Sequence, residues 1–398
     1  MHRPFLVCLL SVATVELPSQ TVHTVGPGSL PQIRDALAIA APGDIVLVQP
    51  GTYAHFDAAV GVTIRAVTPG TVDVDFDRAF LPPGCATSPP CILTAGATTI
   101  TLPPGQSMQL IGLRFAGSST LVYTTTVNHR LEITGGAVQF DDCVVEATGR
   151  SPVTATGTAL HFQDTTLRSL SAMTASSALV ALGCQVTAAS SEFVGGSTTL
   201  GSPGSGIALF ASSLNGSGLS LHGGGVLVGS LGAPALTADA TSAVWLSDST
   251  LMGGNTMCPM SVRAGTVGHL DRCTLGPVTS GCTQLPSGFL PGVERVRPPA
   301  LAMSFDLVFH VQPNGFVALM ASFELASSQL PALTQPWLSP AGGGIGLGLL
   351  FANALGTAAT GFAIPNDPNL LHRQIWVHSA SGSGLPLQVA PTVGGVIR

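Results

Sequence analysis

Two aspartates that could do chemistry occupy the same position in a short repeated pattern. The pattern is six residues long and has an apolar residue at its first and last positions. Two copies are Phe140–Val145 and Phe162–Leu167, and their third residues are Asp142 and Asp164. If these stretches lie on adjacent coils, the two carboxylates stack about 5 Å apart on the solvent side. That separation suits a hard cation or the acid pair of a retaining glycosidase. We therefore predict a catalytic or binding face made of Asp141, Asp142, His161, Asp164 and Arg168.

A structural explanation of the same aspartates stays open. Asp tolerates the backbone dihedrals of a tight corner, and its carboxylate can bond to its own backbone. Asp248 occupies the same position in another copy of the pattern without comparable neighbours. A corner residue with no chemical role would leave the same pattern.

A second acidic group lies nearer the N-terminus, in the sequence Val-Asp-Val-Asp-Phe-Asp. Its strict alternation predicts a strand with the apolar residues inward and Asp73, Asp75 and Asp77 together on the outer face. Three carboxylates on one face are a possible Ca²⁺ site, which we predict as the metal site of the chain. The alternative is a solvated strand face with no bound ion.

The cations of the chain are few, and all of them are arginine. The 14 Lys+Arg residues are 14 arginines, so the 398-residue chain has no lysine, and its net charge is −6. Scattered arginines cannot neutralise a row of phosphates, and a P-loop requires lysine, so both nucleic-acid binding and P-loop chemistry are excluded. The histidines show no ligand pair at helical spacing, which disfavours zinc. No apolar run reaches the roughly 18 residues of a membrane-spanning helix.

The six-residue pattern recurs through the first three quarters of the chain. Its copies end at residues 145, 167, 193, 214, 251 and 275, which gives steps of 22, 26, 21, 37 and 24 residues. Such steps predict the coils of a solenoid, and the step of 37 predicts an insertion around residues 216–239. Stacking is required because no single coil can bury its apolar positions alone. Cys143 and Cys273 occupy the small fourth position, so we expect buried, unreactive thiols there.

The N-terminal part predicts a short helix followed by a strand. Residues 29–40 have apolar residues at helical spacing, with Ser29 as the N-cap and Pro31 in the first turn. An Ala-Pro-Gly-Asp sequence ends the helix, residues 44–49 form an apolar strand, and Pro-Gly-Thr-Tyr follows. This order resembles the N-terminal cap and first turn of right-handed parallel β-helix proteins, the pectin-lyase-like superfamily. The resemblance implies an all-β solenoid with a short N-terminal capping helix.

The resemblance also directs attention to enzyme motifs, because polysaccharide lyases, hydrolases and epimerases share this fold. Galacturonan hydrolases of the superfamily show Asn-x-Asp, Asp-Asp, Gly-His-Gly and Arg-x-Lys motifs. Asp141-Asp142 matches the doublet, but no Asn-x-Asp precedes it and His222-Gly223 lies 80 residues further on. The absence of lysine removes the last motif. Lyases of the fold need acidic Ca²⁺ ligands and a cationic base, for which this chain offers scattered arginines.

A Pro-rich joint precedes a second module. Residues 286–300 contain four prolines and little periodicity, so we predict a linker there. About seven short strands joined by Gly/Pro turns then predict a small β-sandwich over residues 301–398. The run Phe362–Pro368 followed by Trp376 resembles a C-terminal module of bacterial secreted proteins. That resemblance implies sorting, surface attachment or glycan contact, with a passive cap on the C-terminal end of the solenoid as the alternative.

The N-terminus predicts export. Residues 1–20 have a basic start and a short apolar stretch, which is typical of a signal peptide, so the β-helix is assigned to residues 21–285. An extracellular or cell-surface destination permits disulfides. We predict two of them: Cys85–Cys91, which brackets a Pro-rich loop, and Cys258–Cys282.

Two functions are compatible with these features. The first is a secreted or cell-surface β-helix without catalysis that serves in adhesion, interaction or as an envelope scaffold, and the missing enzyme motifs favour it. The alternative is a polysaccharide lyase, a glycoside hydrolase or a carbohydrate-binding protein that uses the outer face of the β-helix. The expected partners are extracellular polysaccharide or envelope components. We expect no cofactor apart from a possible Ca²⁺ ion.

Overall fold

The computed structural model describes fourteen stretches of the chain, which together cover most of both modules. They are residues 20–76, 96–117, 130–148, 150–170, 176–198, 202–226, 232–255, 258–277, 285–322, 325–327, 338–340, 345–371, 373–383 and 387–398. Residues 1–19 of the predicted signal peptide, Asp77 and the cysteines Cys85, Cys91 and Cys282 lie outside them. Within these residues no helix is long and apolar enough to cross a membrane.

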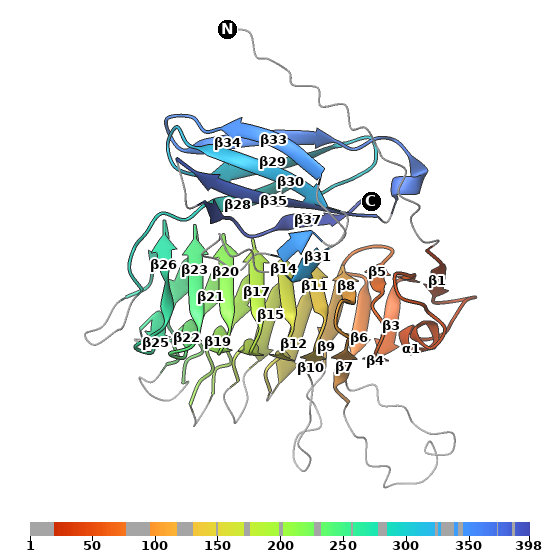
Figure 1. Ribbon diagram of the computed structural model, residues 1–398. Helices are drawn as coiled ribbons and strands as arrows, with labels where there is room; N and C mark the ends of the chain where they lie inside the picture. The colour runs from red at the N-terminus through yellow and green to blue at the C-terminus, as the bar shows by residue number, and fades with distance from the viewer. Residues whose placement is uncertain are drawn as a thin grey trace.

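The first module is a right-handed parallel β-helix, as the family resemblance implies, and its coils are those that the repeat predicts. Each complete coil adds one strand to each of three parallel sheets (Figure 1). Sheet A has ten strands: β1 (Val22–Val25), β2 (Ile45–Val48), β5 (Thr63–Ala66), β8 (Ser107–Ile111), β11 (Ala137–Asp141), β14 (Ala159–Gln163), β17 (Gln185–Ala189), β20 (Ser213–Ser217), β23 (Ala243–Ser247) and β26 (Val267–Asp271). The other two sheets complete each coil, in the order C, A, B along the chain.

Sheet B follows sheet A in each coil and has nine strands: β3 (Gly51–Ala54), β6 (Val72–Asp75), β9 (Leu113–Ala116), β12 (Val144–Thr148), β15 (Thr166–Leu170), β18 (Glu192–Val194), β21 (Ser220–His222), β24 (Thr250–Met252) and β27 (Thr274–Leu275). Sheet C precedes sheet A and has eight: β4 (Asp57–Ala58), β7 (Thr98–Thr101), β10 (Leu131–Thr134), β13 (Val153–Thr156), β16 (Leu179–Leu182), β19 (Ile207–Phe210), β22 (Leu236–Ala238) and β25 (Met260–Val262).

The corner between sheets A and B explains why Asp recurs in the pattern. Asp142, Asp164 and Asp248 have φ angles of 57°, 47° and 50°, so each turns its coil in the left-handed region. Asp is among the residues that tolerate this conformation. The part of the structural explanation that concerns the backbone dihedrals is therefore confirmed for these three aspartates.

One copy of the pattern was placed at the wrong corner. Leu209–Leu214 spans the junction of β19 and β20, which is the corner between sheets C and A. The two corners look alike in sequence because each has a residue in the left-handed backbone conformation followed by a small buried residue. At the corner between sheets C and A these residues are Ala211 and Ser212. The matching corner of that coil is Gly216–Leu221, so the step of 37 residues is an artefact of this placement.

The small fourth position stacks inside the solenoid, as predicted. The hydroxyl of Thr165 donates to the carbonyl of Gln163 at 2.9 Å, and its oxygen lies 3.4 Å from the backbone N–H of Cys143 in the preceding coil. Cys143 is 1% exposed, and burial raises the pKa of its thiol to about 12. Burial also raises the pKa of Cys273, which is only partly buried. Both thiols are structural, as expected.

Aromatic rings fill the middle of the core. Phe140 and Phe162 stack with ring centroids 5.0 Å apart, and Phe193 meets Phe162 edge-on at 5.4 Å. The N-terminal end is covered by α1 (Ile33–Leu37), which is shorter than the helix we predict. Its N-cap is Gln32 rather than Ser29, because residues 26–30 form a turn that pairs with β1 and Pro31 keeps the preceding residue out of the helix.

The second module is a β-sandwich, as predicted. One sheet contains β28 (Gly292–Arg297), β29 (Ser304–His310) and β34 (Thr357–Ala363). The other contains β30 (Phe316–Ser322), β33 (Ile345–Phe351), β35 (Gln374–Gly382), β36 (Gln388–Val389) and β37 (Val393–Val396). A short hairpin of β31 (Leu325–Ser327) and β32 (Leu338–Pro340) and a 3-10 helix, η2 (Pro368–Leu370), complete it. Phe305, Phe309, Val317 and Val377 belong to the core between the two sheets.

Residues 286–300 are more than the linker that we predict, because they contain β28. This strand pairs antiparallel with β29, and its prolines stand before and after it rather than within it. The sandwich also does not cap the C-terminal end of the solenoid. It lies along the side of the solenoid, against the outer face of sheet A (Figure 1).

Candidate functional site

The outer face of sheet A carries a row of polar side chains in register. Gln109, Gln139, His161, Thr187 and Asn215 occupy equivalent positions on five neighbouring strands, and each is at most 3% exposed. Gln109 Nε2 donates to Gln139 Oε1 at 2.5 Å, and His161 Nδ1 lies 2.9 Å from Thr187 Oγ1. A polar row on the outside of a solenoid would normally meet water. Here the sandwich covers it.

Arg295 of β28 joins two of the predicted catalytic carboxylates. Its Nη2 donates to Asp141 Oδ1 at 2.8 Å, and its Nε donates to Asp164 Oδ2 at 3.1 Å. Its Nη1 donates to the carbonyl of Gly394. The side chains of Arg295 and Asp141 are 4% and 6% exposed, and that of Asp164 is 39% exposed. Burial alone lowers the pKa of Arg295, but the charges of Asp141 and Asp164 outweigh it and raise the pKa above its ordinary value.

His161 lies under Trp376, with the ring centroids 5.0 Å apart in an edge-to-face arrangement. Burial, with the charge of Arg295 and the nearby His378, lowers the pKa of His161 to about 3. The ring is therefore neutral near neutral pH, and its Nε2 has no hydrogen-bond partner. In this arrangement it cannot relay protons to solvent.

Asp142 and Arg168 lie apart from this buried group. Burial raises the pKa of Asp142, although its side chain is 45% exposed, and Arg398 Nη2 lies 3.5 Å from its Oδ2. Arg168 belongs to sheet B, where its Nη2 donates to Glu192 Oε2 at 2.8 Å. The structure thus gathers Asp141, His161 and Asp164 beneath the sandwich and does not bring Arg168 to them.

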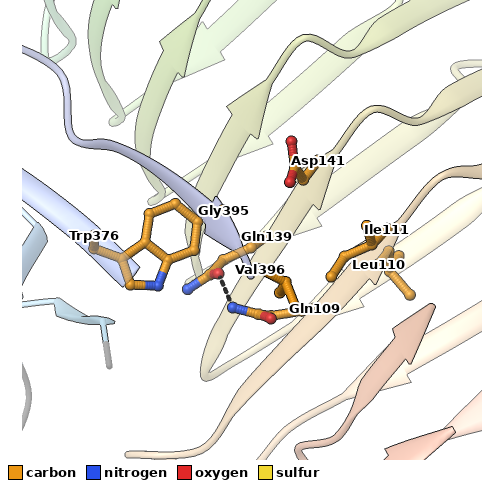
Figure 2. Close-up of a pocket in the computed structure, with 8 residues that line it drawn as sticks. All are labelled: Gln109, Leu110, Ile111, Gln139, Asp141, Trp376, Gly395 and Val396. Atoms are coloured by element: carbon orange, nitrogen blue, oxygen red, sulfur yellow. Dashed lines mark hydrogen bonds between the residues drawn. The ribbon is translucent and has the colours of Figure 1, made fainter. Parts of the chain in front are cut away.

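A crevice at the same interface is lined by both modules (Figure 2). Gln109, Gln139 and Asp141 line it from the solenoid, and Trp376 and Gly395 line it from the sandwich. It leaves no room for a water molecule, so it is a packed seam. A substrate could reach Asp141 and His161 only if the sandwich moved away. The side chains of Asp142, Asp164 and Arg168 are 45%, 39% and 46% exposed. The catalytic role of all five stays a prediction.

The acidic strand near the N-terminus has the predicted alternation. Val72 and Val74 are buried, whereas Asp73 and Asp75 lie partly exposed on the outer face of β6. Arg114 Nη1 lies 3.5 Å from Asp73 Oδ1, and Arg114 Nη2 donates to Glu146 Oε2 at 2.9 Å. No group of three His, Cys, Asp or Glu residues that could hold a metal occurs in the part of the chain that the structure describes. Asp77 is outside that part, so the Ca²⁺ site stays a prediction.

The disulfide predictions also stay untested. Cys258 precedes β25, but its predicted partner Cys282 lies outside the described residues. The same holds for Cys85 and Cys91.

Sequence reasoning missed the residues that close the interface. The sequence prediction puts Arg295 in a linker and gives Trp376 no contact with the solenoid. Gly292–Arg297 carries no strict alternation of apolar and charged residues, because its two valines are three positions apart, so those β-branched residues offer only a weak signal for a strand. A Ser–His pair was also missed: Ser322 Oγ lies 2.8 Å from His378 Nε2. Both residues are at most 2% exposed, and the other ring nitrogen faces Thr392 rather than a carboxylate, so the pair is not arranged as a hydrolytic nucleophile.

Sheet C offers a different, uncovered face. Thr101, Thr134, Thr156, Leu182 and Phe210 follow one another along one register row. All five are exposed, Leu182 at 49% and Phe210 at 41%. The row presents hydroxyls at one end and apolar side chains at the other.

No protein-family model and no curated protein sequence matches this chain. Solved structures do resemble it. Pectin methylesterase PemA from Erwinia chrysanthemi shares 10% identity over 68% of this chain and 93% of its own, with a TM-score of 0.40. The A-module of mannuronan C-5 epimerase AlgE6 from Azotobacter vinelandii shares 11% identity over 64% of this chain and 89% of its own, with a TM-score of 0.29.

A third similar structure is tailspike protein 2 of an Escherichia coli O157:H7 bacteriophage. It shares 9% identity over 94% of this chain and 63% of its own, with a TM-score of 0.31. All these likenesses concern the path of the chain, and no activity follows from them. The resemblance to the pectin-lyase-like superfamily is confirmed as a fold: the chain is a right-handed parallel β-helix with a C-terminal β-sandwich.

Proposed function

We propose that the protein is a non-catalytic β-helix scaffold whose sandwich is docked along its side. The observation that carries this proposal is the Arg295 contact. One buried guanidinium holds both Asp141 and Asp164, two of the three carboxylates of the predicted catalytic face. General acid–base catalysis requires a group within reach of the substrate. Asp141 is 6% exposed beneath the sandwich, and the partly exposed Asp164 is paired with the same guanidinium.

Turnover assays test this proposal directly. The purified full chain is incubated with acidic and neutral polysaccharides at pH 5 and pH 7.5, with and without Ca²⁺, and products are followed by reducing ends and by absorbance of unsaturated sugars. We expect no turnover above a heat-denatured control. Turnover that Asp142→Ala or Asp164→Ala abolishes would overturn the proposal.

The second candidate is a polysaccharide-directed protein, and the uncovered row on sheet C favours it. Hydroxyls beside apolar side chains can contact both the polar and the apolar faces of a sugar. The names of the pectin methylesterase and the epimerase agree with this candidate better than with a scaffold, and they leave open whether such a protein binds or cleaves.

Glycan binding distinguishes the two candidates. A glycan array probed with the full chain and with a Phe210→Ala variant measures binding on sheet C, and Phe351→Ala in the sandwich is the matched control because Phe351 is also exposed, at 76%. Binding that only Phe210→Ala weakens supports the second candidate. The absence of glycan binding leaves the scaffold proposal, with envelope components as the partners to test.

Secretion is part of both candidates. Its support is the sequence of residues 1–20, and its test is the fractionation of cells that express the full chain. The protein is expected in the medium or on the surface with a shortened N-terminus.

A further inference from the structure

The interface between the two modules is unusually polar for a permanent one. On the solenoid side, Gln139 Nε2, His161 Nε2 and Gln163 Oε1 are buried without a hydrogen-bond partner. Each such atom loses its water when the interface closes and gains nothing in return. Interfaces between domains of one chain that are this polar commonly open and close.

His161 is the titratable group at the centre of this interface. It is 1% exposed and meets Trp376 of β35 edge-on. The charged and titratable groups that face it are Arg295 of β28 and His378 of β35. Asp141 and Asp164, on its own side, are already held by Arg295. A proton added to His161 in the closed form would therefore lie near the cation of Arg295, while Asp141 and Asp164 are already paired with that cation.

We propose that the sandwich is an acid-released cover of sheet A, and that protonation of His161 drives its separation from the solenoid. The released form exposes the polar row from Gln109 to Asn215 to solvent. This proposal goes beyond the proposed function, since it concerns how the two modules are held together and not what they bind.

The direction of the pH effect follows from the environment of His161. Burial lowers its pKa to about 3 in the closed form, whereas a solvent-exposed His in the open form titrates near 6.5. The open form therefore binds the proton first, and the closed form loses stability as the pH falls below about 6.5. The raised pKa of Asp142 acts in the opposite direction, but at lower pH, where carboxylates titrate. Between pH 7.5 and pH 5 the His161 effect dominates, and the opening equilibrium increases about 30-fold.

Thiol labelling at a buried interface position measures this opening. Ser217 is 2% exposed, its Oγ accepts the backbone N–H of Val293 at 3.2 Å, and cysteine is nearly isosteric with serine. The labelling rate of Ser217→Cys, read by peptide mass spectrometry and divided by the rate in denaturant at the same pH, reports the open fraction. We expect this ratio to increase about 30-fold between pH 7.5 and pH 5.

Two histidine variants in this background complete the test. His161→Gln is expected to remove most of the pH dependence, whereas His269→Gln is expected to retain it, because His269 lies in the same row of sheet A but is exposed. Small-angle X-ray scattering of the unmodified chain provides a second measurement, with a larger radius of gyration at pH 5. A labelling ratio that does not change with pH would overturn the proposal, as would an equal response in His161→Gln or a loss of solenoid structure at pH 5.

Discussion

Removing Arg295 tests whether the two modules are held together by one buried ion pair. In Arg295→Ala, Asp141 keeps a carboxylate that is 6% exposed and loses its cation, and the carbonyl of Gly394 loses a donor. Breaking a buried pair from one side costs about 3–5 kcal/mol, because an uncompensated charge remains. Asp164 is 39% exposed and regains water, so the expected cost lies at the lower end, about 3 kcal/mol.

The measurement is thermal and urea unfolding of the full chain, followed by circular dichroism. A loss of about 3 kcal/mol corresponds to a decrease of roughly 6–12 °C in Tm for modules of this size. Adding Asp141→Asn to Arg295→Ala is expected to restore part of the loss, since the amide carries no charge. That recovery separates an uncompensated charge from a simple loss of packing.

Arg168→Ala is the matched control for Arg295→Ala. Its pair with Glu192 has a similar distance, 2.8 Å, but the two side chains are 46% and 32% exposed. An exposed pair contributes about 0–1 kcal/mol, so this variant is expected to melt close to the unmodified protein. If Arg295→Ala and Arg168→Ala cost the same within about 1 kcal/mol, the reasoning about the interface is refuted.

Three further outcomes are expected within the solenoid. Phe162→Ala removes a fully buried ring between two others and should cost about 3–5 kcal/mol in urea unfolding; a cost below 1 kcal/mol would contradict the stacked core. Gly204→Ala places a Cβ against the backbone carbonyl of Ser176 and should lower the free energy of unfolding by about 1–3 kcal/mol. Its control is Gly346→Ala in β33 of the sandwich, where a Cβ meets no atom within 4 Å and the effect should be close to neutral. Equal melting points for the two variants would contradict the close contact between coils at Gly204. The Cys143 thiol, with its pKa raised to about 12 by burial, should resist a thiol reagent at pH 8 until the chain unfolds, and labelling of that peptide in the native protein would show otherwise.

The sequence predicted the solenoid because its physics is local and repetitive. Each coil must place an apolar residue on both sides of a tight corner and a small residue between them. This requirement produces a pattern that recurs once per coil in the sequence. The error at Leu209–Leu214 has the same origin. Two corners of one coil impose the same requirement, so a six-residue pattern alone cannot distinguish Ala211 at one corner from Gly218 at the other.

The candidate site was harder to predict because its decisive partner is remote. Asp142 and Asp164 do occupy equivalent corners of adjacent coils, as the pattern indicates. The residue that pairs with Asp164 and helps to bury Asp141 is Arg295, which lies 131 residues beyond Asp164. No periodicity connects them. The face that a distant module covers is decided by the complementarity of two folded surfaces. A single sequence does not show which surfaces are complementary.

The lateral position of the sandwich has a consequence for how the whole chain unfolds. In a bare solenoid each coil contacts only its neighbours, so coils can fray one at a time from either end. Here hydrogen bonds tie the sandwich to four separate levels of the stack, through Asp141, Asp164, Asn215 and Ser247. The sandwich therefore links these coils to one another through a second set of contacts. Loss of one internal coil must also break contacts that serve the others, so this stretch is expected to melt as a single cooperative unit.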